Sequence, residues 1–95
     1  MQLPSEVKIG PVTYEIREEA RTAVEGNYGS ILYSDSLITL MPGQSPVQKQ
    51  ITLWHEMLHG ILRAAGEIEH DEKVIISLSH GIVQLLQENP ALAAA

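Results

Sequence analysis

Five consecutive residues near the middle of the chain, His55-Glu56-Met57-Leu58-His59, combine two imidazoles and a carboxylate at a spacing suited to metal chemistry. On a helix, residues four apart lie one turn above each other on the same side. His55 and His59 would therefore present both imidazoles to one point, as a tetrahedral Zn²⁺ requires. Glu56 is rotated by about 100° from His55, which makes it a poor third ligand but lets it reach a water on the ion.

This arrangement implies metal-assisted amide hydrolysis. A water on zinc can have a pKa near 7 instead of about 15.7, so the Glu56 carboxylate would suffice as the base. The hydroxide would then attack a carbonyl that the zinc polarises. The alternative interpretation is an ordinary helix with two histidines and a glutamate on its polar face. The flanking sequence favours the metal site, because it places these residues on a well-defined helix.

The signals for that helix lie at both of its ends. Ser45 is a typical N-cap, Pro46 suits the first helical position, and Gln48 is placed to complete a capping box. Gly66 stands where a left-handed C-cap is expected. We interpret Trp54 as core packing that fixes the helix. The predicted apolar stripe, with spacings of three and four, is Val47, Ile51, Trp54, Leu58, Ile61, Leu62 and Ala65.

A second helix is expected after a short polar connection. Asp71 suits its N-cap, and Asn89-Pro90 ends it at about Glu88. Because the connection is short, we expect the two helices to run nearly antiparallel. The predicted apolar stripe of the second helix is Val74, Ile75, Leu78, Ile82, Leu85 and Leu86.

A catalytic zinc site needs a third protein ligand and an open fourth position. Glu72 and His80 lie about 12 Å apart along the second helix, so both cannot bind one ion. Each also has an ordinary role: Glu72 as an acid favoured by the helix dipole, and His80 as a hydrogen-bonded, partly buried histidine. Spacing leaves the choice open. The downstream candidates are Glu67, Glu69, His70, Asp71, Glu72 and His80.

Short strands are expected before the first helix. Val7–Arg17 alternates in polarity and predicts a strand or a tight hairpin broken at Gly10-Pro11, while Asp35-Ser36 is a polar turn. Strands followed by helices predict an α+β domain, with an antiparallel sheet of about three strands packed on two antiparallel helices. The other expected segments are a loop over 18–24, a turn over 26–29, strands over 30–33 and 37–41, and frayed ends over 1–6 and 91–95.

The composition restricts the class of protein. Ninety-five residues predict one domain over 1–95, small enough that a bound zinc would contribute to folding as well as to chemistry. A net charge of −6, with six scattered Lys and Arg, argues against a nucleic-acid partner. The absence of Cys excludes disulfides and thiolate metal sites. No signal peptide or membrane span is recognisable, so we expect a cytoplasmic protein without a membrane partner.

Over residues 7–90 the chain resembles the small zincin-like metallopeptidases of phages and prophages, which are distantly similar to the ImmA/IrrE group. In such proteins the motif helix follows a small antiparallel sheet, and a glutamate on the next helix completes the gluzincin ligand set. That glutamate matches Glu72. His80 departs from the pattern, since relatives often have Asn there. Three roles are open for it: a substitute ligand, a hydrogen-bond donor to the transition state, or a residue that hydrogen-bonds to a ligand. The matching residues are Ile38-Thr39-Leu40, the run from Thr52 to Leu62, Asp71-Glu72-Lys73-Val74, Leu78, Gly81, Gln84, Leu86 and Asn89-Pro90.

The resemblance implies a function and a set of roles. Zn²⁺ would be held by His55, His59 and Glu72, with Glu56 as the base that activates water for peptide-bond hydrolysis. The substrate would be a peptide or protein, and the enzyme an endopeptidase of the host bacterial cytoplasm. The alternative function is a zinc-stabilised protein-interaction module of phage origin without proteolytic activity.

The resemblance also implies a substrate-binding strand before the motif helix. Here that strand would contain Ile38, Thr39 and Leu40, and it would hold an extended peptide by main-chain pairing at an open sheet edge. An ordinary hairpin strand is an equally good interpretation of the same residues. Tyr28 and Tyr33 are candidate oxyanion donors, and nothing in their spacing selects either.

Overall fold

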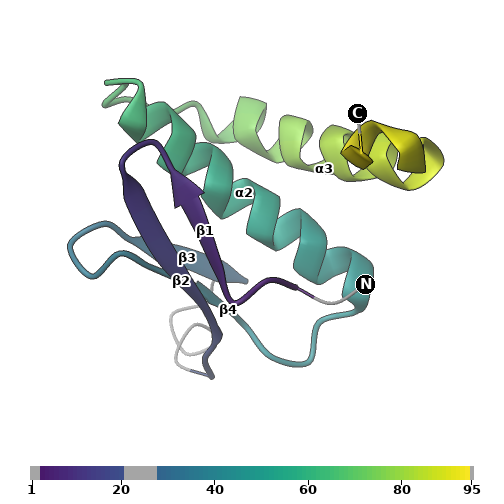
Figure 1. Cartoon of the computed structure of the whole chain (residues 1–95), viewed down its shortest axis with the longest axis horizontal. Helices are drawn as coiled ribbons and strands as arrows, with labels where there is room; N and C mark the ends of the chain where they lie inside the picture. Colours follow the sequence, from purple (N-terminus) through teal and green to yellow (C-terminus); the bar gives the residue numbers. More distant parts are fainter. Residues whose placement is uncertain (1–2, 21–27, 95) are drawn as a thin grey trace.

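The structure, a computed structural model, describes residues 3–20 and 28–94. These residues form an α+β fold in which a four-stranded mixed sheet precedes two α-helices (Figure 1). None of the helices in the described ranges is long and apolar enough to cross a bilayer. The elements are β1 (Glu6–Ile9), β2 (Val12–Glu18), β3 (Gly29–Leu32), β4 (Leu37–Leu40), α2 (Pro46–Ala64), α3 (Glu72–Glu88) and the 3₁₀ helix η1 (Pro90–Ala94).

Two hairpins build the sheet in the order β1-β2-β4-β3. The predicted break at Gly10-Pro11 is the turn between β1 and β2, where Gly10 has a φ of 58°. The pairs β1–β2 and β3–β4 are antiparallel, but β2 and β4 are parallel. The expectation of about three antiparallel strands is therefore wrong. Local turn signals define each hairpin, whereas the pairing between hairpins depends on contacts distant in sequence.

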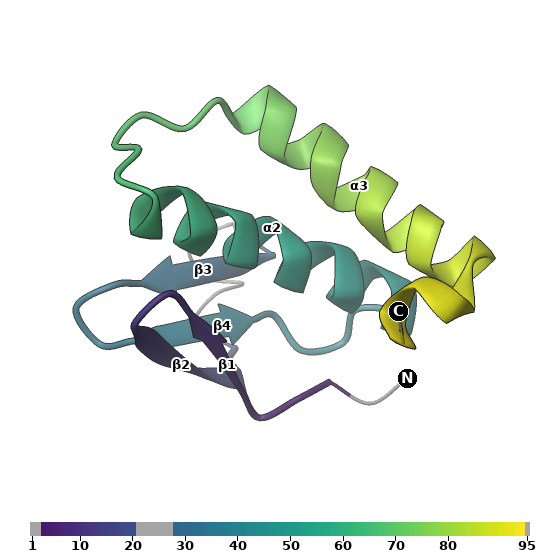
Figure 2. The same ribbon diagram turned by 45° about the horizontal axis from the view of Figure 1, so that its top comes forward.

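Helix α2 lies between the sheet and α3, and α3 runs back in the opposite direction along its outer side (Figures 1 and 2). The core under α2 joins both hairpins to the helix. At Gly60 the helix approaches the sheet closely, because an added Cβ would lie 2.9 Å from Ile9 Cδ1. The buried residues of this core are Ile9, Tyr14, Ile38, Leu40 and Leu53.

Both ends of α2 have the predicted caps. The Ser45 side chain accepts a hydrogen bond from the Gln48 backbone N–H, and Pro46 occupies the first turn. The Gln48 side chain donates to Thr52 Oγ1 instead of returning to the cap. At the other end Gly66 has a φ of 89°, and the Glu67 N–H donates to the Leu62 carbonyl at 2.9 Å. This Schellman geometry ends the helix where the glycine predicts.

The predicted apolar stripe of α2 is not its main buried face. Trp54 is only half-buried, and Val47 and Ile61 are exposed. The stripe was misassigned because α2 contacts two neighbours, the sheet and α3, so its buried surface covers more than one face. The buried residues of α2 are Thr52, Leu53, Glu56 and Gly60.

Helix α3 begins and ends as the sequence predicts. The Asp71 side chain caps it by accepting from the Lys73 N–H, and Glu88 is its last residue. Its stripe is partly wrong, since α3 contacts α2 on one side and only Ile75, Ser79 and Val83 are buried. After it, residues 90–94 form η1 rather than the expected frayed tail, and Glu6 already belongs to β1. The predicted loop and turn over 21–27, and residues 1–2 and 95, lie outside the described residues.

Candidate metal centre

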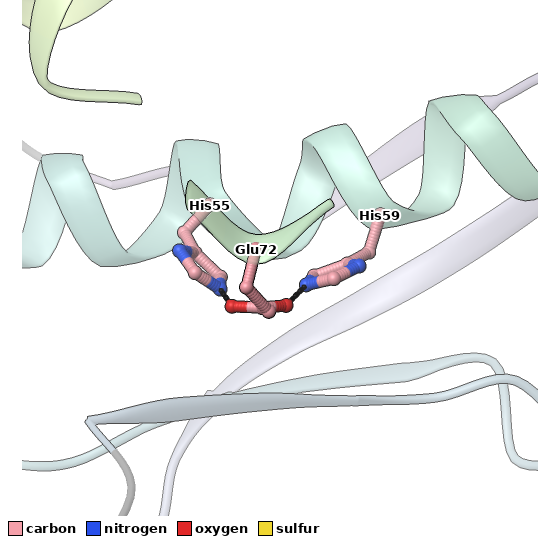
Figure 3. A group of neighbouring side chains, drawn as sticks. All are labelled: His55, His59 and Glu72. Carbon is pink, nitrogen blue, oxygen red and sulfur yellow. Dashed lines mark ion pairs between the residues drawn. The ribbon is translucent and has the colours of Figure 1, made fainter. Parts of the chain in front are cut away.

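His55 and His59 of α2 and Glu72 at the start of α3 converge on one point (Figure 3). His59 Nε2 lies 2.6 Å from Glu72 Oε1, and His55 Nε2 lies 3.2 Å from Glu72 Oε2. The carboxylate thus faces both imidazoles with different oxygens (Figure 3). The sequence predicts the two histidines from their spacing, and the structure brings Glu72 to them.

This donor set suits a divalent ion. One ligand atom from each of the three residues lies within 4.8 Å of the other two. Ligand atoms on a tetrahedral zinc with bonds of about 2.0–2.2 Å lie about 3.3–3.6 Å apart. The two separations between Glu72 and the histidines, 2.6 and 3.2 Å, are therefore within small side-chain adjustments of that geometry. Two imidazole nitrogens and one carboxylate oxygen are also a ligand combination found at catalytic zinc sites.

Two capping motifs place the third residue. The Schellman turn at Gly66 ends α2 one turn beyond His59, and the Asp71 cap starts α3 at Glu72. Glu72 is consequently the first residue of α3, from which its flexible side chain reaches back to the middle of α2. It remains 57% exposed, while His55 and His59 are 24% and 14% exposed.

Glu56 is the buried acid of the site. The residue is 6% exposed, and its Oε2 is buried without a hydrogen-bond partner among the described residues. Its Oε1 lies 4.0 Å from His55 Nε2. Burial, and secondarily the charge of Glu72, raises the pKa of Glu56 from 4.5 to about 7. An ion beside the histidines would favour the carboxylate, and a water on it would supply the missing partner.

Burial favours the neutral form of the His59 imidazole. Burial lowers the pKa of its imidazole, while the nearby Glu72 carboxylate opposes that shift. A metal-ligating imidazole must present a free lone pair. Burial of His59 therefore favours the protonation state that a metal needs.

His80 lies at the margin of the site. Its Nδ1 bonds to the Ile76 carbonyl at 2.9 Å, and the side chain is exposed. It lines the same cavity as His55, Glu56 and Glu72, but it is outside the converging group of three. Of the two candidate third ligands, the structure brings Glu72 to the histidines, and His80 faces the cavity beside them.

Two hollows meet at the candidate centre, with volumes of about 440 and 400 Å³. Both are lined by Gly29, His55, Glu56 and Glu72. Tyr28 lines the larger of these two hollows and Tyr33 the smaller. Each candidate oxyanion donor therefore lines one hollow beside the site. A third hollow of about 610 Å³ lies beyond Tyr33, next to Arg63 and His70, and the three converging residues do not line it.

Strand β3, rather than β4, is the sheet edge beside the site. The predicted open edge at Ile38, Thr39 and Leu40 is wrong, because β4 is paired on both sides and these residues are at most 2% exposed. The expectation failed because β4 inserts between β2 and β3, which closes the main-chain route to a peptide there. Among the described residues β3 is an outer strand, and Gly29, Ser30 and Ile31 line the smaller hollow.

The hydrogen-bond pattern identifies which groups of β3 face outward. Met41 N–H donates to the Tyr28 carbonyl at 2.8 Å, and residues 28 and 41 extend the register in which Ser30 opposes Thr39. Residues of an antiparallel pair alternate between bonded and non-bonded positions. The main-chain groups of Gly29 and Ile31 therefore point away from β4.

Gly29 permits β3 to lie directly against α2 at Glu56. An added Cβ would be 2.5 Å from Thr52 Cγ2 and 3.1 Å from the Thr39 carbonyl oxygen. Gly29→Ala is expected to lower the free energy of unfolding of the metal-free protein by about 1–3 kcal/mol through overpacking, measured by urea denaturation. Gly81→Ala is the control: nothing lies within 4 Å of its added Cβ, so helix propensity should raise stability by up to about 1 kcal/mol. Equal stability of the Gly29 variant and the wild type would contradict the close-packing argument.

Sequence reasoning missed three contributions to the site. Gly29 was assigned to a turn, Ile31 to an ordinary strand, and His70 was only one of several ligand candidates. His70 Nδ1 lies 2.7 Å from His59 Nδ1. The only signal in the sequence was the proximity of these residues to predicted turns, which does not indicate a role.

Comparisons of the chain with protein-family models, with curated proteins and with solved structures found no match. The geometry of these residues is therefore the basis for proposing a function.

Proposed function

We propose that this protein is a zinc-dependent peptidase in which His55, His59 and Glu72 hold the ion. The observation that carries the proposal is the Glu72 carboxylate facing both Nε2 atoms, with the buried carboxylate of Glu56, whose Oε2 has no hydrogen-bond partner among the described residues, one residue after His55. When bound, zinc would supply Lewis-acid polarisation of a carbonyl and would lower the pKa of water.

Glu56 is the proton carrier of the proposed reaction. Its carboxylate takes a proton from the attacking water and later delivers it to the leaving amine. In the metal-free protein burial raises the pKa of Glu56 to about 7, and a bound ion would lower it, so the carboxylate would be available as a base at neutral pH. Gly29 packs closely against Thr52 and the Cγ of Glu56, which limits the positions that the Glu56 side chain can take.

The proposed substrate is an extended peptide on the edge of β3 that no other described strand covers. The outward main-chain groups of Gly29 and Ile31 can pair with it, as in strand addition to an open sheet. Both residues line the hollow that contains His55, Glu56 and His59. A peptide in this position passes its main chain beside the candidate metal centre.

Metal removal tests the proposal. The purified protein should contain about one zinc per chain, cleave members of a mixed peptide library, and lose that activity on dialysis against a chelator. Re-addition of zinc should restore cleavage. Because the ion binds only the folded state, a free zinc concentration of 1,000 Kd should add about 4 kcal/mol to the free energy of unfolding. Cleavage that survives complete zinc removal, or a protein that binds no zinc, would refute the proposal.

A second candidate function is a protein-interaction module in which zinc only stabilises the fold. It is favoured by the outward side of α3, where Val74, Leu78 and Leu85 are each about half exposed: 51%, 47% and 55%. Exposed apolar groups that share one helix face are typical of interaction surfaces. This function predicts zinc-dependent stability without cleavage of any peptide.

A further inference from the structure

His70 lies in the connection between α2 and α3, behind His59 as seen from Glu72. Its Nδ1 is 2.7 Å from His59 Nδ1, and its Nε2 is 2.9 Å from the Glu67 carbonyl oxygen. The two rings are stacked with centroids 5.0 Å apart. Both nitrogens of His70 therefore have partners, and one of these partners is a candidate metal ligand.

The positions of the hydrogen atoms in the hydrogen-bonded series from His59 through His70 to Glu67 follow from the Glu67 carbonyl. A carbonyl oxygen can only accept, so His70 Nε2 carries a hydrogen and donates it to Glu67. In a neutral imidazole the other nitrogen then has a lone pair, so His70 Nδ1 accepts from His59 Nδ1–H. That leaves the lone pair of neutral His59 on Nε2, the atom that faces Glu72.

His70 is not part of the converging group of three, and its Nδ1 is hydrogen-bonded to the Nδ1 of His59. The other nitrogen of His70 is engaged by Glu67. His70 thus acts on the site through His59.

We propose that His70 is a positioning residue that holds His59 in its Nδ1–H tautomer with Nε2 directed at the ion. The inference rests on the proposed metal site and adds to it a determinant outside the ligand set. Groups that hydrogen-bond to a metal-ligating histidine commonly change metal affinity about 10- to 100-fold.

Glu67, the last residue of this hydrogen-bonded series, is held in place by the C-cap of α2. The Glu67 N–H bonds to the Leu62 carbonyl within the Schellman turn, which fixes the backbone that presents the Glu67 oxygen. The turn at Gly66 therefore ends the motif helix and, through Glu67 and His70, orients the second histidine of the motif.

Two substitutions at His70 separate hydrogen bonding from shape. His70→Phe keeps a planar ring but has no acceptor, so zinc affinity, measured by competition with a chromophoric chelator, should fall about 10- to 100-fold. His70→Asn restores an acceptor near the position of Nδ1 and should recover affinity to within about threefold of wild type. Ile68→Ala is the control, because Ile68 lies in the same connection and is 93% exposed; it should bind zinc like wild type.

A spectroscopic readout distinguishes positioning from a general effect on the fold. In long-range ¹H–¹⁵N spectra at neutral pH, zinc-loaded wild type should show His59 protonated at Nδ1 and His70 at Nε2, and the His59 proton should exchange rapidly with water in His70→Phe. Circular dichroism of the metal-free variants reports whether they are folded.

The outcomes separate this inference from the proposed function. Unchanged zinc affinity in folded His70→Phe, or His59 protonated at Nε2 in zinc-loaded wild type, would overturn the role of His70 alone. Failure of wild type to bind zinc would overturn both. Normal zinc binding with the expected variant pattern but no cleavage of any peptide would support the role of His70 and refute the peptidase.

Discussion

Replacing Glu56 by glutamine is expected to reduce peptide hydrolysis about 100- to 10,000-fold, the usual contribution of a positioned general base. Zinc should remain bound at one per chain, because Glu56 is outside the converging ligand group. Metal content and initial cleavage rates, measured on the same preparations, test both statements. Full activity in Glu56→Gln would end the proposed mechanism, and loss of zinc would make Glu56 a ligand.

The same substitution should stabilise the metal-free protein at alkaline pH. The pKa of Glu56 rises from 4.5 to about 7 on folding, mainly through burial. Because the folded state binds this proton more tightly, the associated stability is complete below pH 4.5 and is lost as the pH rises through 7. One pKa unit corresponds to about 1.4 kcal/mol, so ionising buried Glu56 costs about 3 kcal/mol at pH 8.

Urea denaturation between pH 5 and pH 8 measures this cost. Wild type should lose stability relative to Glu56→Gln across this range, with a difference at pH 8 of about 1–3 kcal/mol because the buried amide is itself desolvated. The lowered pKa of His59 makes stability rise with pH near the titration of His59. This contribution is the same in both proteins and cancels in their difference. Glu6→Gln, at an exposed position of β1, is the matched control and should change neither slope nor activity. Parallel curves for wild type and Glu56→Gln would contradict the cost of burying this charge.

Local signals account for the helix caps, which the sequence predicted correctly. The caps at Ser45, Gly66 and Asp71 involve residues within a few positions of one another, and they define where both helices begin and where α2 ends. The spacing of His55 and His59 is likewise a property of one helix. Glu72 was selected by resemblance, and the short connection between the caps brings it to the histidines.

Longer-range contacts explain what the sequence did not predict. Nothing near Leu37–Leu40 indicates that β4 enters between β2 and β3, so the strand adjoining the site was misidentified. The buried face of α2 was misassigned because a helix with neighbours on two sides has no single apolar stripe. The contact between His70 and His59 depends on the path of the connection after Gly66, and histidine spacing carries no information about that path.

Glu72→Gln is the second substitution with a large expected effect. It keeps the size of the side chain but removes the charge that faces both imidazoles. Because it alters a ligand directly, zinc affinity should fall by more than the roughly 10- to 100-fold expected for groups behind the ligands. Competition titration against a chelator measures the loss.

The metal-free fold should tolerate this change. Glu72 is 57% exposed, and exposed ion pairs contribute at most about 1 kcal/mol. Urea midpoints of metal-free Glu72→Gln and wild type should therefore nearly coincide, so that a loss of zinc is attributable to the ligand and not to unfolding. Glu72 also contributes to the raised pKa of Glu56. Its neutralisation should lower the pKa of Glu56, so metal-free Glu72→Gln should lose less stability than wild type as the pH rises through 7, and the midpoints should coincide best near pH 5.

His80→Asn provides the comparison that separates the two candidate third ligands. His80 bonds to the carbonyl of Ile76 in its own helix and lies outside the converging group, so zinc affinity should stay within about threefold of wild type. A change in cleavage rate without a change in affinity would indicate contact with the substrate in the shared cavity. The reverse pattern, with zinc lost in His80→Asn and retained in Glu72→Gln, would transfer the ligand role to His80. It would also require α3 to move along α2, because the two residues lie about 12 Å apart along the helix axis.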